Sequence, residues 1–193
     1  YNFNNAWSAR LGRQVISYDN QRIFEEIDWL QQGQSHDAMV VSYKKDKNQL
    51  DLGAALNADA EGLYRDLYLT NYKNMQYAWF HTSFNDLQLS LLALNTGFQY
   101  QEPITTDLKV DYMQTFGTYL KYKKNKFDAD LSLYAQTGKG KLVNNNTTVN
   151  AYNAGLNFNY AFTDQVKVGL GYEYLSGKDQ TDTDDKIKSF NPI

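Results

Sequence analysis

The sequence contains no cysteine, only two prolines and no long apolar run. Without cysteine, the 193-residue chain can form neither a disulfide nor a thiolate metal site. No stretch approaches the roughly 18 consecutive apolar residues of a membrane helix, which excludes a helical membrane protein. Positive charge is also scarce, because 19 Lys and Arg stand against 22 Asp and Glu, giving a net charge of −3. We therefore expect no nucleic-acid partner, since no basic stripe is present to follow a phosphate backbone.

What the sequence does contain is alternation of apolar and polar residues in segments of about ten residues. The clearest pair lies near the end, where Tyr152, Leu156 and Phe158 alternate with polar or small residues and residues 166–174 repeat the pattern after a turn. Similar alternation occurs at residues 50–57, 87–93, 115–122 and 127–136. Period-two patterning predicts β-strands, about nine in all. The low mean hydropathy of −0.64 fits a membrane barrel, in which only alternate residues face lipid.

The connections between these segments are predicted to alternate between tight turns and long polar loops. The long loops are expected at residues 17–34, 58–73, 98–109, 138–149 and 177–193, which are rich in Asn, Asp, Gly, Thr and Lys. Short turns on one side and long loops on the other are typical of an all-β, antiparallel transmembrane β-barrel of the cell outer membrane. Tyr and Phe near the ends of the apolar face predict interfacial girdles. We therefore expect one domain, residues 1–193, surrounded by the lipid bilayer and lipopolysaccharide.

The number of predicted strands leads to a further expectation about the size of the barrel. Nine strands is odd, whereas single-chain bacterial barrels close with an even number. The pattern also ends in a long loop, so we expect this chain to be part of a larger barrel. A soluble lipocalin-like barrel would show the same alternation, and only the loop asymmetry favours the membrane alternative.

A more specific signal lies in residues 12–38. It comprises Gly12-Arg13-Gln14, the run YDNQRIF at residues 18–24, Trp29 and QGQSHDA at residues 32–38. This resembles the opening of the alginate export family of outer-membrane barrels in its Bacteroidota branch, with the pattern GRQ, YDDQRLF, W and QGRSHDA. Gln34 stands where that pattern has Arg, which weakens a polyanion-binding cluster. The resemblance implies a barrel of sixteen to eighteen strands that conducts small or polymeric solutes.

The function expected on these grounds is passive diffusion of solutes, anionic ones among them, through a hydrated and charged lumen. No cofactor is expected. An alternative is a structural or partner-binding barrel, with a plugged lumen and outer loops that contact another surface protein.

Candidate pore residues are cations, because rings of Arg and Lys select anions. Arg10, Arg13, Arg22 and Lys167 are proposed as pore or solute-binding residues, with Arg65 as a further candidate. Alternation from Trp7 places Arg10 inward and Arg13 outward, unless a bulge at Gly12 switches the phase. An interfacial position for Arg13 is the other option, since Arg facing mid-bilayer lipid costs about 2–4 kcal/mol. All of these cations could instead be loop or rim residues paired with nearby Asp and Glu.

Three further features are considered as candidates for catalysis, metal binding and pore narrowing. Ser35-His36-Asp37 has the residue types of a hydrolase triad, but neighbours in a strand point to opposite faces, so no enzyme and no catalytic residues are predicted. The acidic run at residues 179–185 lacks the spacing of a calcium loop and is interpreted as a solvated loop. The first long loop, with Glu25, Glu26 and Asp28, could fold inward and narrow the pore, or remain a surface loop.

Overall fold

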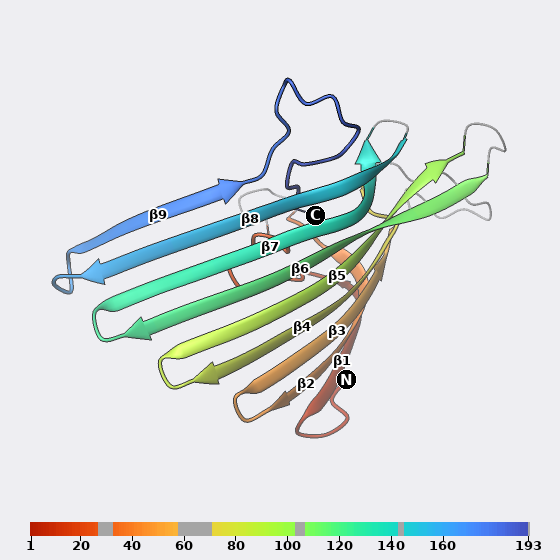
Figure 1. Ribbon diagram of the computed structural model, residues 1–193. Helices are drawn as coiled ribbons and strands as arrows, with labels where there is room; N and C mark the ends of the chain where they lie inside the picture. Colours follow the sequence, from red (N-terminus) through yellow and green to blue (C-terminus); the bar gives the residue numbers. More distant parts are fainter. Residues whose placement is uncertain (27–32, 58–70, 103–106, 143–144, 193) are drawn as a thin grey trace.

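The computed structural model describes residues 1–26, 33–57, 71–102, 107–142 and 145–192, and these form nine long antiparallel strands. Each strand pairs with the next in sequence, so the order is β1 to β9 without a crossover (Figure 1). In the described parts of the chain, all regular structure is strand and no helix could cross a membrane. The strands are β1 (Trp7–Gln14), β2 (His36–Lys45), β3 (Asn48–Leu56), β4 (Asn74–Phe84), β5 (Leu87–Gln101), β6 (Leu108–Lys124), β7 (Phe127–Leu142), β8 (Asn145–Ala161) and β9 (Lys167–Leu175).

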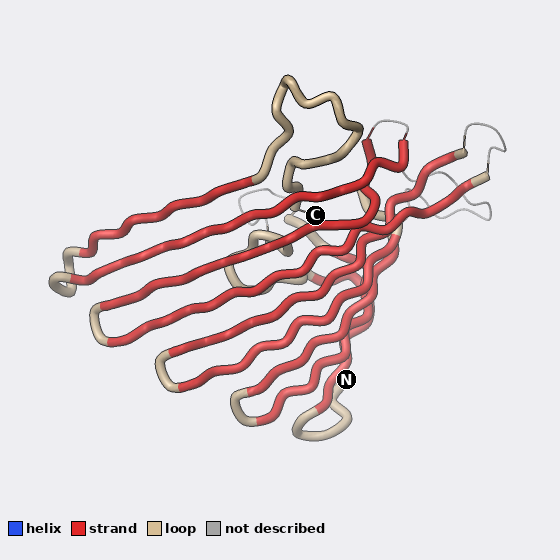
Figure 2. The backbone as a smooth tube through the Cα atoms, in the orientation of Figure 1, coloured by secondary structure: helices blue, strands red, loops and turns tan. Residues whose placement is uncertain are grey.

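The sheet is curved and open, with β1 and β9 at its two edges (Figure 1). Four tight turns, β2–β3, β4–β5, β6–β7 and β8–β9, gather at one end of it (Figure 2). Asp46, Asn85 and Asn125 occupy three of these turns with positive φ, a conformation that Asp and Asn tolerate better than most residues. Tight turns thus alternate with longer connections along the chain, as the sequence predicted.

The outer face of the sheet, which we define as the face carrying Leu52, Leu91 and Leu133, is apolar and exposed. Those three side chains are 46%, 45% and 47% exposed. Aromatic residues line this face at the short-turn end, including Trp7 against Tyr43, with ring centroids 4.8 Å apart, and the Tyr122, Phe127 and Phe158 group. An exposed apolar face of this extent fits contact with lipid. The aromatic edge has the composition and the position expected of an interfacial girdle at this end.

Toward the long-loop end, the outer face of β4 to β6 carries a row of amide side chains. Asn95 donates to Gln76 at 2.8 Å and accepts from Gln114 at 2.8 Å, forming an amide ladder across β4, β5 and β6. Thr137 on β7 stands opposite Gln114 and is exposed. The apolar band therefore covers only part of the height of the strands.

Two of the expected long loops were wrong in extent. Residues 98–101 and 108–109 belong to β5 and β6, and residues 138–142 and 145–149 belong to β7 and β8. Lys139 pairs with Thr148 and Gly140 with Thr147 in the ladder. These strand ends have the composition of a loop, although their backbone remains paired. The other long connections are residues 15–35, residues 57–73 and the residues from 176 on. Residues 27–32, 58–70 and 193 lie outside the described residues.

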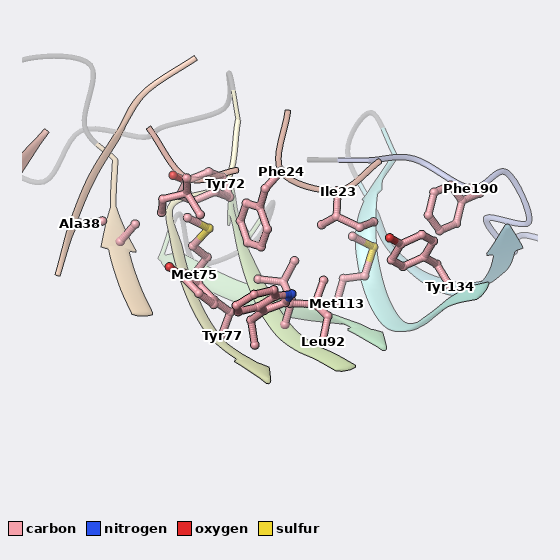
Figure 3. Packing of buried hydrophobic residues seen from close by; sticks show 14 of the residues in the cluster. Ile23, Phe24, Ala38, Tyr72, Met75, Tyr77, Leu92, Met113, Tyr134 and Phe190 are labelled. Carbon is pink, nitrogen blue, oxygen red and sulfur yellow. The ribbon is translucent and has the colours of Figure 1, made fainter. Parts of the chain in front are cut away.

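The hydrophobic core lies on the inner face, which is opposite to the outer face. It is made by side chains of β2 to β8 together with residues 15–26, which we name the inner segment. Ile16, Ile23 and Phe24 of this segment are 2–3% exposed. Figure 3 shows Phe24 above Met75 and Tyr77, and Ile23 above Met113. The described part of the first long connection, residues 15–26, thus folds inward, as one of the two sequence-based alternatives proposed, whereas Asp28 lies outside the described residues.

Candidate functional site

The inner segment follows β1 directly and crosses the inner face from β3 to β9. Its turn is built by the Asp19-Asn20 pair: Tyr18 accepts a backbone hydrogen bond from Gln21 at 2.9 Å, and Asp19 takes a φ of 53°. Asp tolerates this left-handed conformation, and both the Asp19 and the Asn20 side chains bind groups of the sheet. The segment is therefore a defined turn and not an extended surface loop.

Tyr18 anchors the segment to β3 and β4. Its hydroxyl lies 2.9 Å from Asp51 Oδ2, to which it donates, and 3.1 Å from the Tyr77 hydroxyl. Its ring stacks on Trp79, with centroids 4.4 Å apart. Burial is the main cause that raises the pKa of the Tyr18 phenol, so the hydroxyl remains a hydrogen-bond donor.

Asp19 and Asn20 extend the anchoring across the sheet. Trp79 Nε1 donates to Asp19 Oδ2 at 2.9 Å, and the Tyr134 hydroxyl on β7 donates to Asn20 Oδ1 at 2.9 Å. Burial raises the pKa of the Asp19 carboxyl, while hydrogen bonds from Ser90 and Trp79 oppose that rise. Two adjacent residues thus bind opposite sides of the curved inner face.

Two glycines make these anchors possible. A Cβ on Gly53 would lie 2.2 Å from the Tyr77 ring, and one on Gly117 would lie 2.5 Å from the Tyr134 ring. Each tyrosine stands directly opposite its glycine in the neighbouring strand. The ring lies over the glycine and its hydroxyl reaches the inner segment. Tyrosine packing over a cross-strand glycine is a known device of curved sheets.

Arg22 is the residue through which the inner segment contacts β9, at the far edge of the sheet. Its guanidinium forms an ion pair with Glu173 of β9, whose Oε1 also accepts a hydrogen bond from Asn153 at 2.8 Å. The two side chains of the pair are 32% and 36% exposed. Of the four predicted pore cations, Arg22 is therefore the one that lies in the inner segment, and its charge is compensated.

The other predicted cations are placed separately. Arg10 is on the inner face of β1, opposite Val40, and Lys167 is on the inner face at the start of β9, opposite Ala161. These two strands form opposite edges of the sheet, so the structure does not bring the cations into one cluster. Arg65 lies outside the described residues.

Arg13 is a correction to the predicted set, because it lies on the outer face. The register of β1 with β2 is continuous from Trp7 to Gln14, so there is no bulge, although Gly12 has a φ of 115°. Arg13 pairs with Asp37 at 2.9 Å near the long-loop end, with 74% of its side chain exposed. Since the bulge is absent, the interfacial position remains the sequence-based expectation for Arg13, and its positive charge does not line the inner face.

The adjacent His36 and Asp37 also occupy opposite faces. His36 is 2% exposed on the inner face with its Nδ1 bonded to the Tyr72 hydroxyl, while Asp37 is on the outer face with Arg13. The two side chains cannot act at one point, as the strand geometry predicted. Among the described residues, no group of His, Asp and Glu is arranged to hold a metal ion.

The segment that follows β9 also lies against the inner face. Gln136 Nε2 donates to the Asn191 carbonyl at 2.7 Å and Phe190 is 7% exposed, near Tyr134. In its acidic part, Lys188 forms ion pairs with Asp182 and with Asp184, the latter at 2.9 Å. Hydrogen bonding to Lys188 lowers the pKa of Asp184. Two carboxylates of this run, those of Asp182 and Asp184, are thus ion-paired with Lys188.

Two hollows open on the inner face on either side of the inner segment. One, of about 590 Å³, lies toward the short turns and is lined by Lys44, Lys47, Lys121, His81 and amide and hydroxyl groups. The other, of about 700 Å³, lies over β7 to β9 and is lined by Arg22, Glu25, Glu173, Asn157 and glycines. Both are polar, in contrast to the outer face, and this combination suits a water-filled passage through a lipid-facing wall.

Sequence reasoning missed the residues that organise this site. Tyr18, Asp19 and Asn20 lie within the motif quoted for its family resemblance, but no role was assigned to them. The Asp-Asn dipeptide, a turn signal, could have indicated the left-handed turn. No local signal indicates that Arg22 meets Glu173, because 151 residues separate them.

Comparison with known proteins identifies the family of this chain. No curated protein matches the sequence. The model of the alginate export family matches residues 2–193, and the chain belongs to that family.

Proposed function

We propose that the protein is an outer-membrane channel that passes small or polymeric polar solutes, anions among them, by passive diffusion. Membership of a transport family supports this proposal and disfavours an enzyme. The observation that carries it is the contrast between the two faces, with exposed Leu and aromatic residues outside and two polar hollows inside. In this proposal, lipid and lipopolysaccharide contact the outer face, and solutes contact Arg10, Lys167 and the hollows. No bound cofactor is needed for diffusion.

Planar-bilayer recording of the reconstituted protein tests the proposal. We expect stepwise, ohmic conductance, with a reversal potential that depends on the salt gradient because fixed charges line the passage. Empty bilayers and bilayers with heat-denatured protein serve as controls. The absence of conductance at every salt gradient would contradict a channel function.

A second candidate is a barrel with a plugged lumen that binds another surface protein. The inner segment and residues 188–191 favour it, because both cover the inner face through specific hydrogen bonds. This candidate predicts a closed wild-type protein that copurifies with a stable partner and that conducts only when residues 15–26 are removed. An open wild-type channel without a partner would eliminate it.

A further inference from the structure

The two hollows of the inner face share one lining residue, Asp19. The hollow toward the short turns and the hollow over β7 to β9 otherwise have different walls. A solute that moves from one hollow to the other along the inner segment must therefore pass this side chain. Position alone makes Asp19 the common element of the passage.

The carboxylate of Asp19 is held in place from both sides. Trp79 donates to its Oδ2 at 2.9 Å, and Trp79 is itself fixed between the rings of Tyr18 and His81, at 4.4 and 5.5 Å. The next residue, Asn20, is bound by the Tyr134 hydroxyl. A charge fixed by such contacts acts on each passing ion at the same place and does not swing away.

The charges of the two hollows differ in sign. Apart from Asp19, the first hollow has three lysines, Lys44, Lys47 and Lys121, and one carboxylate, Asp46. The second has Glu25 and Glu173 against Arg22, which is already paired with Glu173. Among the described residues, no Lys or Arg forms an ion pair with Asp19. Its negative charge is thus not paired at the boundary between a cationic and an anionic hollow.

We propose that Asp19 is the residue that sets ion selectivity in this passage, by opposing the entry of anions from the lysine-lined hollow into the second one. The inference rests on the proposed channel function. The decisive charge is then a carboxylate, whereas the predicted cations are dispersed or, in the case of Arg22, paired.

The test is the anion-to-cation permeability ratio of Asp19→Asn in planar bilayers, in mildly alkaline buffer where Asp is ionised. Asn keeps the size of the side chain, can accept from Trp79 and tolerates a positive φ. Because unit charges about 4 Å apart interact appreciably even in water, we expect the ratio to rise by about fivefold. The control is Asp164→Asn, which removes the same charge from a turn residue that lines neither hollow, and it should leave the ratio unchanged.

The absence of cysteine provides a second variant for use on a folded channel. Asp19→Cys can be modified during recording with a thiol reagent carrying a sulfonate or with one carrying a trimethylammonium group. The anionic adduct should lower the anion-to-cation permeability ratio, and the cationic adduct should raise it. Equal responses to both reagents, or an unchanged ratio in conducting Asp19→Asn channels, would overturn the inference. The absence of conductance in the wild type would instead contradict the proposed function, so the two failures are distinguishable.

Discussion

At the scale of single residues, the inner face depends on pairs in which a glycine accommodates a tyrosine. Gly53 lies under Tyr77 and Gly117 under Tyr134, and both hydroxyls contact the inner segment. The alternation predicted that Tyr134 faces inward, but not what it binds. A pattern of period two indicates a face of the sheet, whereas a hydrogen bond to Asn20 depends on how a distant segment folds.

Replacing either glycine with alanine should therefore destabilise the protein. In Gly53→Ala and Gly117→Ala the tyrosine ring must move away from the new methyl group, and we expect a loss of about 1–3 kcal/mol in the free energy of unfolding. Urea titration in lipid vesicles measures it. Gly177→Ala is the matched control, because a Cβ there meets no atom within 4 Å. Equal stability of all three variants would contradict this packing.

A second residue-scale prediction concerns pH. Burial raises the pKa of the Asp19 carboxyl. This carboxyl therefore binds its proton more tightly when the inner segment is docked on the sheet than when it is undocked. Docking should therefore be strongest below the ordinary Asp pKa of about 3.9 and should weaken as pH rises through the raised value. The charge of His81 on β4 acts on Asp19, and Asp19 in turn interacts with Tyr119 on β6 and Tyr134 on β7.

Hydrogen exchange of residues 16–24, measured from about pH 4 to about pH 7 and corrected for intrinsic rates, tests this prediction. Protection should decrease with rising pH in the wild type. Asp19→Asn should lack this decrease, because its amide does not titrate. An identical profile in both proteins would show that Asp19 does not control docking.

At the scale of strands, the sequence predicted the apolar centres of the elements better than their ends. Leu87, Leu89 and Leu91 lie on the outer face and Gln88 and Ser90 on the inner face, as their alternation indicated. Residues 138–149 were expected to form a loop because they contain Lys, Gly, Asn and Thr. The ladder continues through the described part of this region, because backbone pairing does not require an apolar face.

The same contrast gives a prediction about charge tolerance along β7. Leu133 and Thr137 are both exposed on its outer face, the first in the apolar band and the second beside the amide ladder. We expect Leu133→Arg to cost about 2–4 kcal/mol in unfolding from vesicles and Thr137→Arg about 0–1 kcal/mol. Similar costs at both positions would place the edge of the lipid band elsewhere.

At the scale of the whole molecule, the inner segment connects the two edges of the sheet, β1 and β9. It leaves β1 and is bound by β3, β4, β7 and β9. Family membership was indicated by residues 12–38, and the structure gives that motif a physical role: its YDNQR run forms the turn and the contacts that cross the inner face. The Arg22–Glu173 pairing could not be predicted, because it requires knowledge of the full curvature.

A double-mutant cycle measures this pairing. Arg22→Ala, Glu173→Gln and the double variant should show a coupling of about 0.2–1 kcal/mol, since both side chains are about one-third exposed. The readout is protection of the inner segment against hydrogen exchange, and the coupling should decrease as salt is added. Additive effects, or a coupling that salt does not change, would argue against a stabilising ion pair.

The Arg22–Glu173 contact also has a consequence for the order of folding. The inner segment is synthesised early, but its last anchor is on β9, 151 residues later. Contacts of such long sequence separation form slowly, because a large loop must close first. The contacts of the inner segment can therefore be completed only after β9 has paired with β8. The rate at which this segment becomes protected against hydrogen exchange should thus measure how fast the last strands assemble.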